Sequence, residues 1–177
     1  FTLQRHLATR MSAQMAQDMN HRAKEMQLLS RRERLRDPTR SAQDKQAALR
    51  EMQQAYPVYA WIGLTDTQGT IIASTEPRLT GVHVPQRSWF VQGSKGLYFE
   101  GAHEATLLAK LLPPARWDEL PLRLLDVSLP VHDRDGQFIG VLAAHLSLDW
   151  AYELRKHLLA SVEDQSLEMI LFDPEGG

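Results

Sequence analysis

The sequence predicts an α+β fold, in which a long N-terminal helix precedes an antiparallel sheet with flanking helices. Three observations predict it. The chain has no proline or glycine before Pro38, and its apolar residues there recur every four positions. From Pro57 onward, short runs of β-branched and aromatic residues alternate with turn residues. Two of these turns, 66–69 and 132–136, carry the Asp and Gly residues that are typical of hairpins.

The N-terminal stretch predicts one helix over residues 1–36. At 1.5 Å per residue its length is about 54 Å, more than a compact domain of this size covers. Such a helix either pairs with a copy of itself or stands as a stalk, and we expect a homodimer. The repeating apolar residues are read as a packing seam: Leu3, Leu7, Met11, Met15 and Met19.

A second helix is expected over residues 42–55, after a break at Asp37-Pro38, with Ser41 as its N-cap. The arginines around the break suggest either an anion site or a solvated helix end, and we favour the solvated end because cations are stabilised at a helix C-terminus. These residues are Arg31, Arg32, Arg34, Arg36 and Arg40.

The remaining elements follow from alternation and turn signals. The expected strands are 58–64, 70–74, 97–99, 122–131 and 138–148. Helical segments are expected at 86–92, 104–112 and 149–162. Residues 169–176 repeat the pattern of 61–69, an apolar strand followed by Asp, two residues and Gly, which suggests the start of a second module.

Composition excludes several functions. A net charge of −2 provides no electrostatic basis for binding nucleic acid or an anionic membrane surface. The absence of cysteine excludes disulfides, thiolate zinc sites and a cysteine nucleophile. No nucleophile elbow and no phosphate-binding loop is present, so this chain is not expected to be an enzyme or to carry a cofactor. Without an initiator Met, a signal peptide or a transmembrane run, we expect a piece of a longer protein.

The segment Gln86 to Phe90 is the strongest candidate for a binding site. The Arg87 guanidinium offers a planar fork of donors that suits a carboxylate. Trp89 and Phe90 supply rings for a core and a pocket wall. Tyr98 is expected on a short strand near the same pocket. Asp126 stands in an apolar strand and therefore needs a partner or an edge position.

His103 and His145 suggest a metal or haem site, with Asp126 as a candidate third ligand. The spacing is not diagnostic, since Leu107 stands where a metalloprotease motif beginning at His103 would need its second histidine. A strand histidine is more often a hydrogen-bonded core residue, so no metal is predicted.

The order of these motifs resembles a known family. A long helix leads to a strand and the turn Asp66 to Gly69, then to Arg87-Ser88-Trp89-Phe90, and then to Pro130-Val131-His132-Asp133 and Gly140-Val141-Leu142. This resembles the membrane-distal module of double Cache sensor domains of bacteria. Segments 102–112 and 141–150 are more specifically similar to sensor regions attached to diguanylate cyclases.

The resemblance implies a PAS-like fold with an antiparallel sheet of about five strands. It implies the extracytoplasmic, periplasmic part of an inner-membrane protein, which binds a small molecule and signals through helices to a cytoplasmic output domain. The expected layout is a stalk and second helix at 1–55, a sensing module at 56–150, and a connecting helix with the first strand of a second module at 151–177.

The resemblance also marks two departures. Amino-acid-binding members carry a Tyr where this chain has Val82 and an Asp where it has His145. Both departures favour a carboxylate, another anion or a polar metabolite over an α-amino acid. The alternative is a dimerisation or protein-interaction module without a small ligand. The candidate ligand-binding residues are Arg87, Trp89, Phe90, Tyr98, His103, Asp126 and His145.

Overall fold

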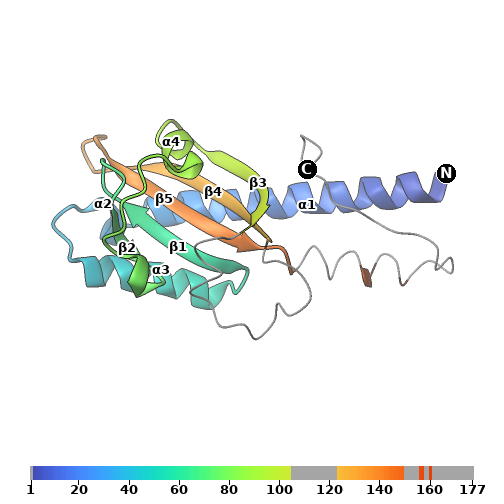
Figure 1. Ribbon diagram of the computed structural model, residues 1–177, viewed down its shortest axis with the longest axis horizontal. Helices are drawn as coiled ribbons and strands as arrows, with labels where there is room; N and C mark the ends of the chain where they lie inside the picture. The colour runs from blue at the N-terminus through green and yellow to red at the C-terminus, as the bar shows by residue number, and fades with distance from the viewer. Residues whose placement is uncertain (1, 105–122, 150–155, 158–159, 161–177) are drawn as a thin grey trace.

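A computed structural model describes residues 2–104, 123–149, 156–157 and 160 of the chain (Figure 1). Its helices are α1 (Thr2–Ser30), α2 (Glu33–Arg36), α3 (Ala42–Ala55), the 3₁₀ turn η1 (Pro77–Leu79) and α4 (Ser88–Gly93). Its strands are β1 (Tyr59–Thr65), β2 (Ile71–Ser74), β3 (Tyr98–Glu104), β4 (Arg123–His132) and β5 (Phe138–Ser147).

The five strands form one sheet in the order β2-β1-β5-β4-β3, and every neighbouring pair is antiparallel. This confirms the predicted α+β fold. After β2 the chain crosses from one edge of the sheet to the other, and α4 lies on this crossing, between β2 and β3 in sequence. The crossing therefore carries the predicted binding segment over the sheet.

The prediction of one helix over residues 1–36 was wrong at its end. The helix α1 stops at Ser30, and Arg32 has an extended backbone with ψ of 134°. The reason is Leu35, which lies nine residues after Met26 and so would be about 180° around a continuous helix from it. Met26 faces the core, so the break is what allows Leu35 to be fully buried in the same core.

The helix α3 has the predicted bounds and the predicted cap, because the Ser41 Oγ accepts a hydrogen bond from the Asp44 backbone N–H at 3.1 Å. The arginines near the break are mostly paired. Arg34 contacts Glu51 and Asp44, and Arg32 and Arg40 also face acids. This corner of the fold is held by ion pairs between the segment after α1 and α3.

Both predicted hairpin turns are present and are built alike. In the first, the Asp66 Oδ1 accepts hydrogen bonds from the backbone N–H groups of Gln68 and Thr70, at 2.8 and 2.9 Å. In the second, the Asp133 Oδ1 accepts from Asp135 and Gln137, both at 2.9 Å. Each aspartate carboxylate thus supplies an acceptor for backbone N–H groups of its own turn.

The strand predicted at 97–99 is longer in the structure, since β3 continues to Glu104. Pairing with β4 extends it, and a bulge between Glu100 and His103 accommodates the irregular part. Glu104 is thus in a strand and not at the start of a helix. The rest of the predicted helix 104–112, nearly all of the predicted helix 149–162 and the predicted repeat at 169–176 lie outside the described residues.

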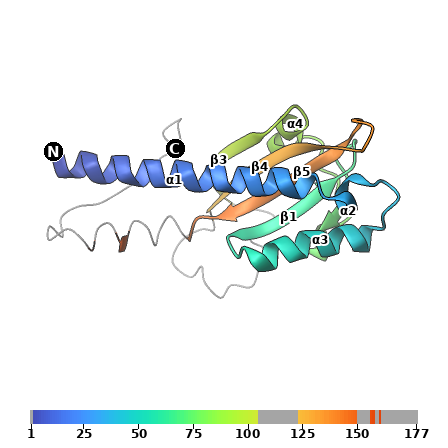
Figure 2. The ribbon, with the colours of Figure 1, turned by 180° about the vertical axis from the view of Figure 1, so that it is seen from behind.

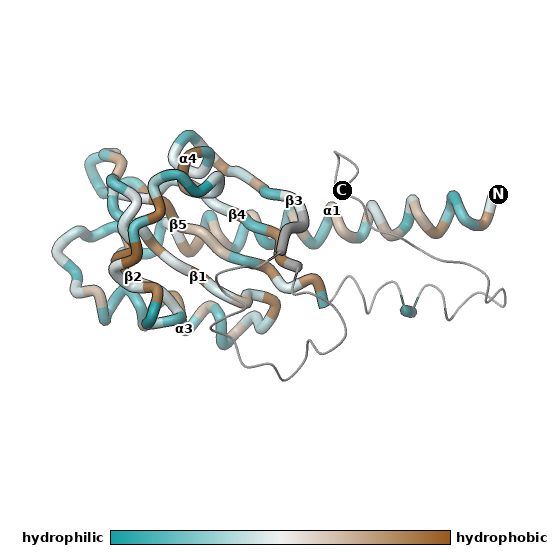
Figure 3. Tube along the Cα trace, viewed as in Figure 1, coloured by the Kyte–Doolittle hydropathy of each residue, from teal (hydrophilic) through white to brown (hydrophobic). Residues whose placement is uncertain are grey.

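The two faces of the sheet are covered differently (Figure 2). We call the face under α1 and α3 the helix face, and the opposite one the α4 face. Hydrophobic residues recur along α1 between polar ones, and its N-terminal half extends past the sheet (Figure 3). The helix-face core includes Met26, Leu29, Leu49, Ile62, Val127, Leu142 and Leu146. The α4-face core includes Trp61, Ile71, Leu79, Val84, Trp89, Leu124, Val141 and Ala143.

A bulge in β1 changes the face to which its side chains point. The register of β1 against β5 shifts between Tyr59 and Trp61, so these residues face opposite sides although they are two positions apart. Tyr59 turns to the helix face, where its hydroxyl donates a 2.6 Å hydrogen bond to the Glu25 carboxylate of α1. Arg22 pairs with Glu25 at 2.8 Å and lies over the Tyr59 ring.

Two effects raise the pKa of Tyr59 well above its usual value of 10.0: burial is the larger, and the hydrogen bond to Glu25 is the second. The unfolded chain ionises near that value and the folded chain does not. The stability that Tyr59 contributes is therefore complete below pH 10 and is lost as the pH rises further.

We predict that Tyr59→Phe lowers the free energy of unfolding by about 1–2 kcal/mol at pH 7, because a buried hydrogen bond to a carboxylate is removed. Above pH 10 the wild type should lose its advantage by about 1.4 kcal/mol per pH unit. Urea unfolding monitored between pH 7 and 11 measures both effects.

Tyr56→Phe is the matched control, because Tyr56 is 40% exposed and its ring also lies under Arg22. It should change stability by less than about 0.5 kcal/mol at every pH. A constant difference between wild type and Tyr59→Phe up to pH 11 would contradict the assignment.

Candidate functional site

The helix α4 is held on the sheet by one buried contact. The Ser128 Oγ of β4 donates a 2.8 Å hydrogen bond to the backbone carbonyl of Trp89. Gly93 allows this approach, since a Cβ at that position would lie 2.5 Å from the Ser128 Oγ. The short helix is therefore fixed with Trp89 against the α4 face.

Three aromatic rings meet on this face. Trp89 is buried and packs on Trp61 of β1, with ring centroids 5.9 Å apart, and Phe90 meets Trp89 edge-on at 6.5 Å. The Trp61 indole N–H donates to the Ser74 Oγ at 2.7 Å, which fixes its ring. Trp89 is part of the core, as predicted for one of the two rings, and Phe90 is half-buried. A place for Phe90 on a pocket wall stays a prediction.

Four residues form a row across four strands of the α4 face. Trp61 of β1 pairs with His145 of β5, His145 pairs with Asp126 of β4, and Asp126 pairs with Glu100 of β3. Residues at paired positions have their side chains on the same face. We call Trp61, His145, Asp126 and Glu100 the cross-strand row.

The centre of the cross-strand row is an ion pair. The His145 Nδ1–H donates a hydrogen bond to the Asp126 Oδ1, and the imidazole stacks on the Trp61 indole with centroids 4.8 Å apart. The Asp126 carboxylate is only 1% exposed, so it depends on polar partners.

The structure brings some of the predicted residues together. Asp126 and His145 are hydrogen-bonded to each other. Tyr98 pairs with Ser128, which is the next residue after Asp126 on the α4 face of β4. Asp126 and Ser128 share one face of β4, while Val127 and Leu129 face the helices, because side chains alternate along a strand.

Two predicted residues are placed apart from this group. The Arg87 residue caps α4 and is exposed, and its side chain forms no hydrogen bond or ion pair with the described residues. His103 pairs with Leu124 near the far end of β3, two positions beyond the Asp126 pairing on β4. Their roles in binding stay predictions.

Sequence reasoning missed Trp61 and Glu100 as members of the site. Trp61 lies in a strand of mostly apolar residues, which gives no local signal that it belongs to a site. Glu100 follows an exposed Phe99, and only its pairing with Asp126 places it on the α4 face. Strand order supplies this information, because β1, β3 and the β4–β5 hairpin are separated from one another in the sequence.

Within the residues that the structure describes, no cluster of three or more histidine, aspartate or glutamate side chains could hold a metal ion. In the same part of the chain, no helix combines the length and apolarity needed to cross a membrane.

A comparison with protein families matches residues 2–176 to the Cache domain. The chain belongs to this family. The family resemblance seen in the sequence is thereby confirmed. No curated protein matches the chain.

Solved structures share the fold. The chain superimposes on the ligand-binding domain of the Pseudomonas aeruginosa PAO1 amino acid chemoreceptor PctC in complex with GABA, with a TM-score of 0.66 and 18% identity over 91% of this chain and 67% of that one. The sensor domain of the Vibrio cholerae histidine kinase DctB superimposes with a TM-score of 0.67 and 19% identity, over 86% of this chain and 58% of that one. The ligand-binding domain of the Campylobacter jejuni chemoreceptor Tlp3 in complex with 4-methylisoleucine superimposes with a TM-score of 0.65 and 12% identity, over 87% of this chain and 62% of that one. The chain thus spans two thirds or less of the length of these three.

We predict a strong energetic coupling between Asp126 and His145. Each single change, Asp126→Ala or His145→Ala, should lower the free energy of unfolding by roughly 3 kcal/mol, because breaking a buried pair removes a partner from the remaining group. The double variant should lose less than the sum by about 1–3 kcal/mol. Urea unfolding of the four proteins at pH 7 measures the cycle.

His21→Ala is the control, since His21 is exposed on α1. It should leave stability unchanged and show no coupling with Asp126→Ala. If the losses of unfolding free energy from the Asp126 and His145 substitutions were additive, the contact between the two side chains would contribute no coupling energy to stability.

Proposed function

We propose that this domain is the extracytoplasmic sensor of a transmembrane signalling protein, and that it binds a small polar molecule on the α4 face. The observation that carries the proposal is the cross-strand row, which combines an indole, an imidazole and two carboxylates on the face opposite α1. Membership of the Cache family supports the sensing role.

The cross-strand row indicates what part of a ligand it would meet. Phe90, half-buried beside Trp89, presents apolar surface, and Asp126 and Glu100 carry carboxylate acceptors. From the sequence, His145 in place of an aspartate argued against an ammonium group. In the structure the Asp126 carboxylate lies directly beside His145, so a carboxylate is still present at this point of the face.

We therefore favour a polar metabolite that presents an ammonium or hydroxyl donor to the cross-strand row. A carboxylate on the same ligand would suit the Arg87 fork at the edge of α4. A ligand that is only anionic is less favourable beside two carboxylates, since like charges repel most in a buried site.

The relay from the site to α1 is short. Ligand contact with His145, which stacks on Trp61, would act on β1, and the bulge places Tyr59 of the same strand against Glu25 of α1. A ligand changes this contact only if it binds two conformations unequally. The Tyr59–Glu25 hydrogen bond is the proposed link between binding and helix position.

The wider context follows the family resemblance. We place the domain in the periplasm, anchored in the inner membrane, with residues 1–55 as stalk, 56–150 as sensing module and 151–177 as the connection to a second module. The proposed output is a diguanylate cyclase, on the basis of segments 102–112 and 141–150. Cyclic di-GMP measured in cells that express the complete gene, with and without ligand, tests this output.

A second candidate function is a protein-interaction module without a small ligand. The burial of Trp61, at 1% exposure, and of Trp89, at 6%, favours it, because a site that has lost its ligand is filled by its own side chains. It predicts that no small molecule binds.

A thermal-shift screen of amines, amino acids and carboxylates, followed by calorimetric titration, separates the two functions. We predict at least one ligand for the wild type, and an affinity lower by about tenfold or more for Asp126→Asn, because a hydrogen bond to a charged group is lost. Ligands with a carboxylate should also bind Arg87→Ala more weakly.

Asp135→Asn and Arg5→Ala are the matched controls, since both residues are exposed and lie away from the α4 face. They should bind like the wild type. Equal affinity in Asp126→Asn and Arg87→Ala would remove the site assignment, and a screen without any ligand would support the interaction module.

The proposed homodimer through α1 has its own test. Leu3 is 54% exposed at the start of the apolar stripe. Sedimentation velocity should find a dimer for the wild type and a shift toward monomer for Leu3→Lys. Thr9→Lys adds the same charge to an exposed position on another side of α1 and should leave the dimer intact. A monomeric wild type would contradict the proposal.

A further inference from the structure

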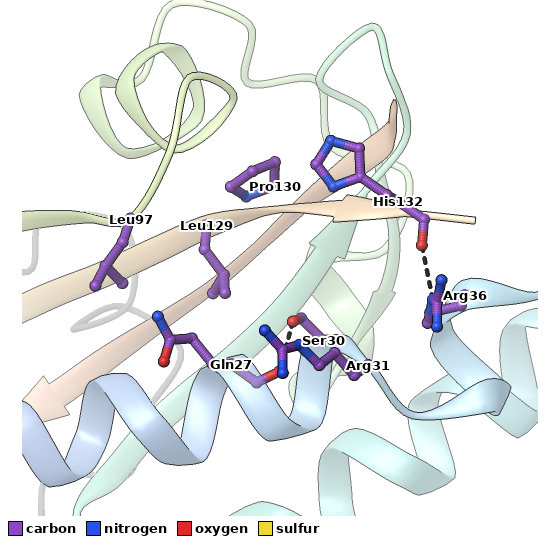
Figure 4. A pocket seen from close by; sticks show the side chains of 8 residues that line it. All are labelled: Gln27, Ser30, Arg31, Arg36, Leu97, Leu129, Pro130 and His132. Carbon is purple, nitrogen blue, oxygen red and sulfur yellow. Dashed lines mark hydrogen bonds between the residues drawn. The ribbon is translucent and has the colours of Figure 1, made fainter. Parts of the chain in front are cut away.

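A hollow lies away from the cross-strand row, between the C-terminal end of α1, α2 and the end of β4. Its volume is about 350 Å³, at the lower end of the range for small-molecule sites. Figure 4 shows Leu97 and Leu129 pointing toward α1 and Gln27 reaching from α1 toward them. The hollow therefore has an apolar side on the sheet and a polar side on the helix.

The charged groups that line the hollow are both basic. They are Arg31 and Arg36. Arg36 is already engaged, since its Nε donates to the His132 carbonyl at 2.9 Å and its Nη2 to the Asp133 carbonyl at 2.7 Å. These bonds leave a positive charge at the base of the hollow without a carboxylate in its lining.

Arg31 differs from its neighbours at this corner. Arg32, Arg34 and Arg40 face acids on or before α3. Arg31 is exposed, and its guanidinium makes no hydrogen bond or ion pair with the described residues. Gln27 lies four positions earlier, so both side chains are on the same side of α1. A guanidinium fork and an amide donor thus face the same space.

We infer that this hollow binds a small organic anion that carries a carboxylate and an apolar group. The carboxylate meets the Arg31 fork and the Gln27 amide, and the apolar group lies against Leu97, Leu129 and Pro130. The bound anion connects the last turn of α1 to β4, so it stabilises the packing of α1 on the sheet. This site is independent of the proposed α4-face site and uses none of its residues.

Benzoate and benzamide are suitable probes, because they share a ring and differ in charge. In ¹⁵N-labelled protein, benzoate should shift the backbone amide signals of residues 27–36, 129, 131 and 132, and benzamide should not. Arg31→Gln should raise the Kd for benzoate by about tenfold or more, since a charge-assisted hydrogen bond is lost.

Arg10→Gln is the matched control, because Arg10 is exposed on the same helix and lies away from the hollow. It should bind benzoate like the wild type. Equal shifts with benzamide, equal affinity in Arg31→Gln, or no shift with benzoate would each overturn the inference. The benzamide comparison needs no substitution, so it decides even if Arg31→Gln fails to fold. Signals of the cross-strand row should not move with benzoate, which keeps this result separate from the ligand screen.

Discussion

The pairing of β5 with β1 on one side and β4 on the other is the constraint on which the rest of the structure depends. Only β5 brings the N-terminal hairpin and the β3–β4 pair into one sheet. A register slip of one residue would move His145 to the helix face and Ala144 to the α4 face, because side chains alternate along a strand. The ion pair with Asp126 and the stacking on Trp61 would both be lost.

Close backbone approach holds this register. At Gly140, with φ of 155°, a Cβ would lie 1.9 Å from the Thr65 carbonyl oxygen, and the next residue donates its N–H to the Thr65 Oγ1. A side chain at this position would force β5 away from β1. The glycine that begins the Gly140-Val141-Leu142 motif is therefore required by the sheet itself, whatever the ligand.

The two faces of the sheet differ in composition. The helix face is apolar and closed by α1 and α3, and it provides stability through burial. The α4 face combines aromatic rings with a buried carboxylate, an arrangement that a pure core would avoid because of its desolvation cost. Buried polar groups of this kind are more informative about function than the apolar core, and the bulge in β1 places Tyr59 on the helix face and Trp61 on the α4 face.

The sequence by itself determined the elements with local causes. Periodicity located α3 and most of α1, the capping hydroxyl of Ser41 set a helix start, and Asp66 and Asp133 built their own turns. The motif order also led to the correct family. Tertiary structure alone decided the end of α1, because burial of Leu35 overrides helix continuity, and the length of β3, because β4 extends it. It also decided which side chains share a site. Trp61, Glu100, Asp126 and His145 come from four strands, and only strand order and register bring them into one row.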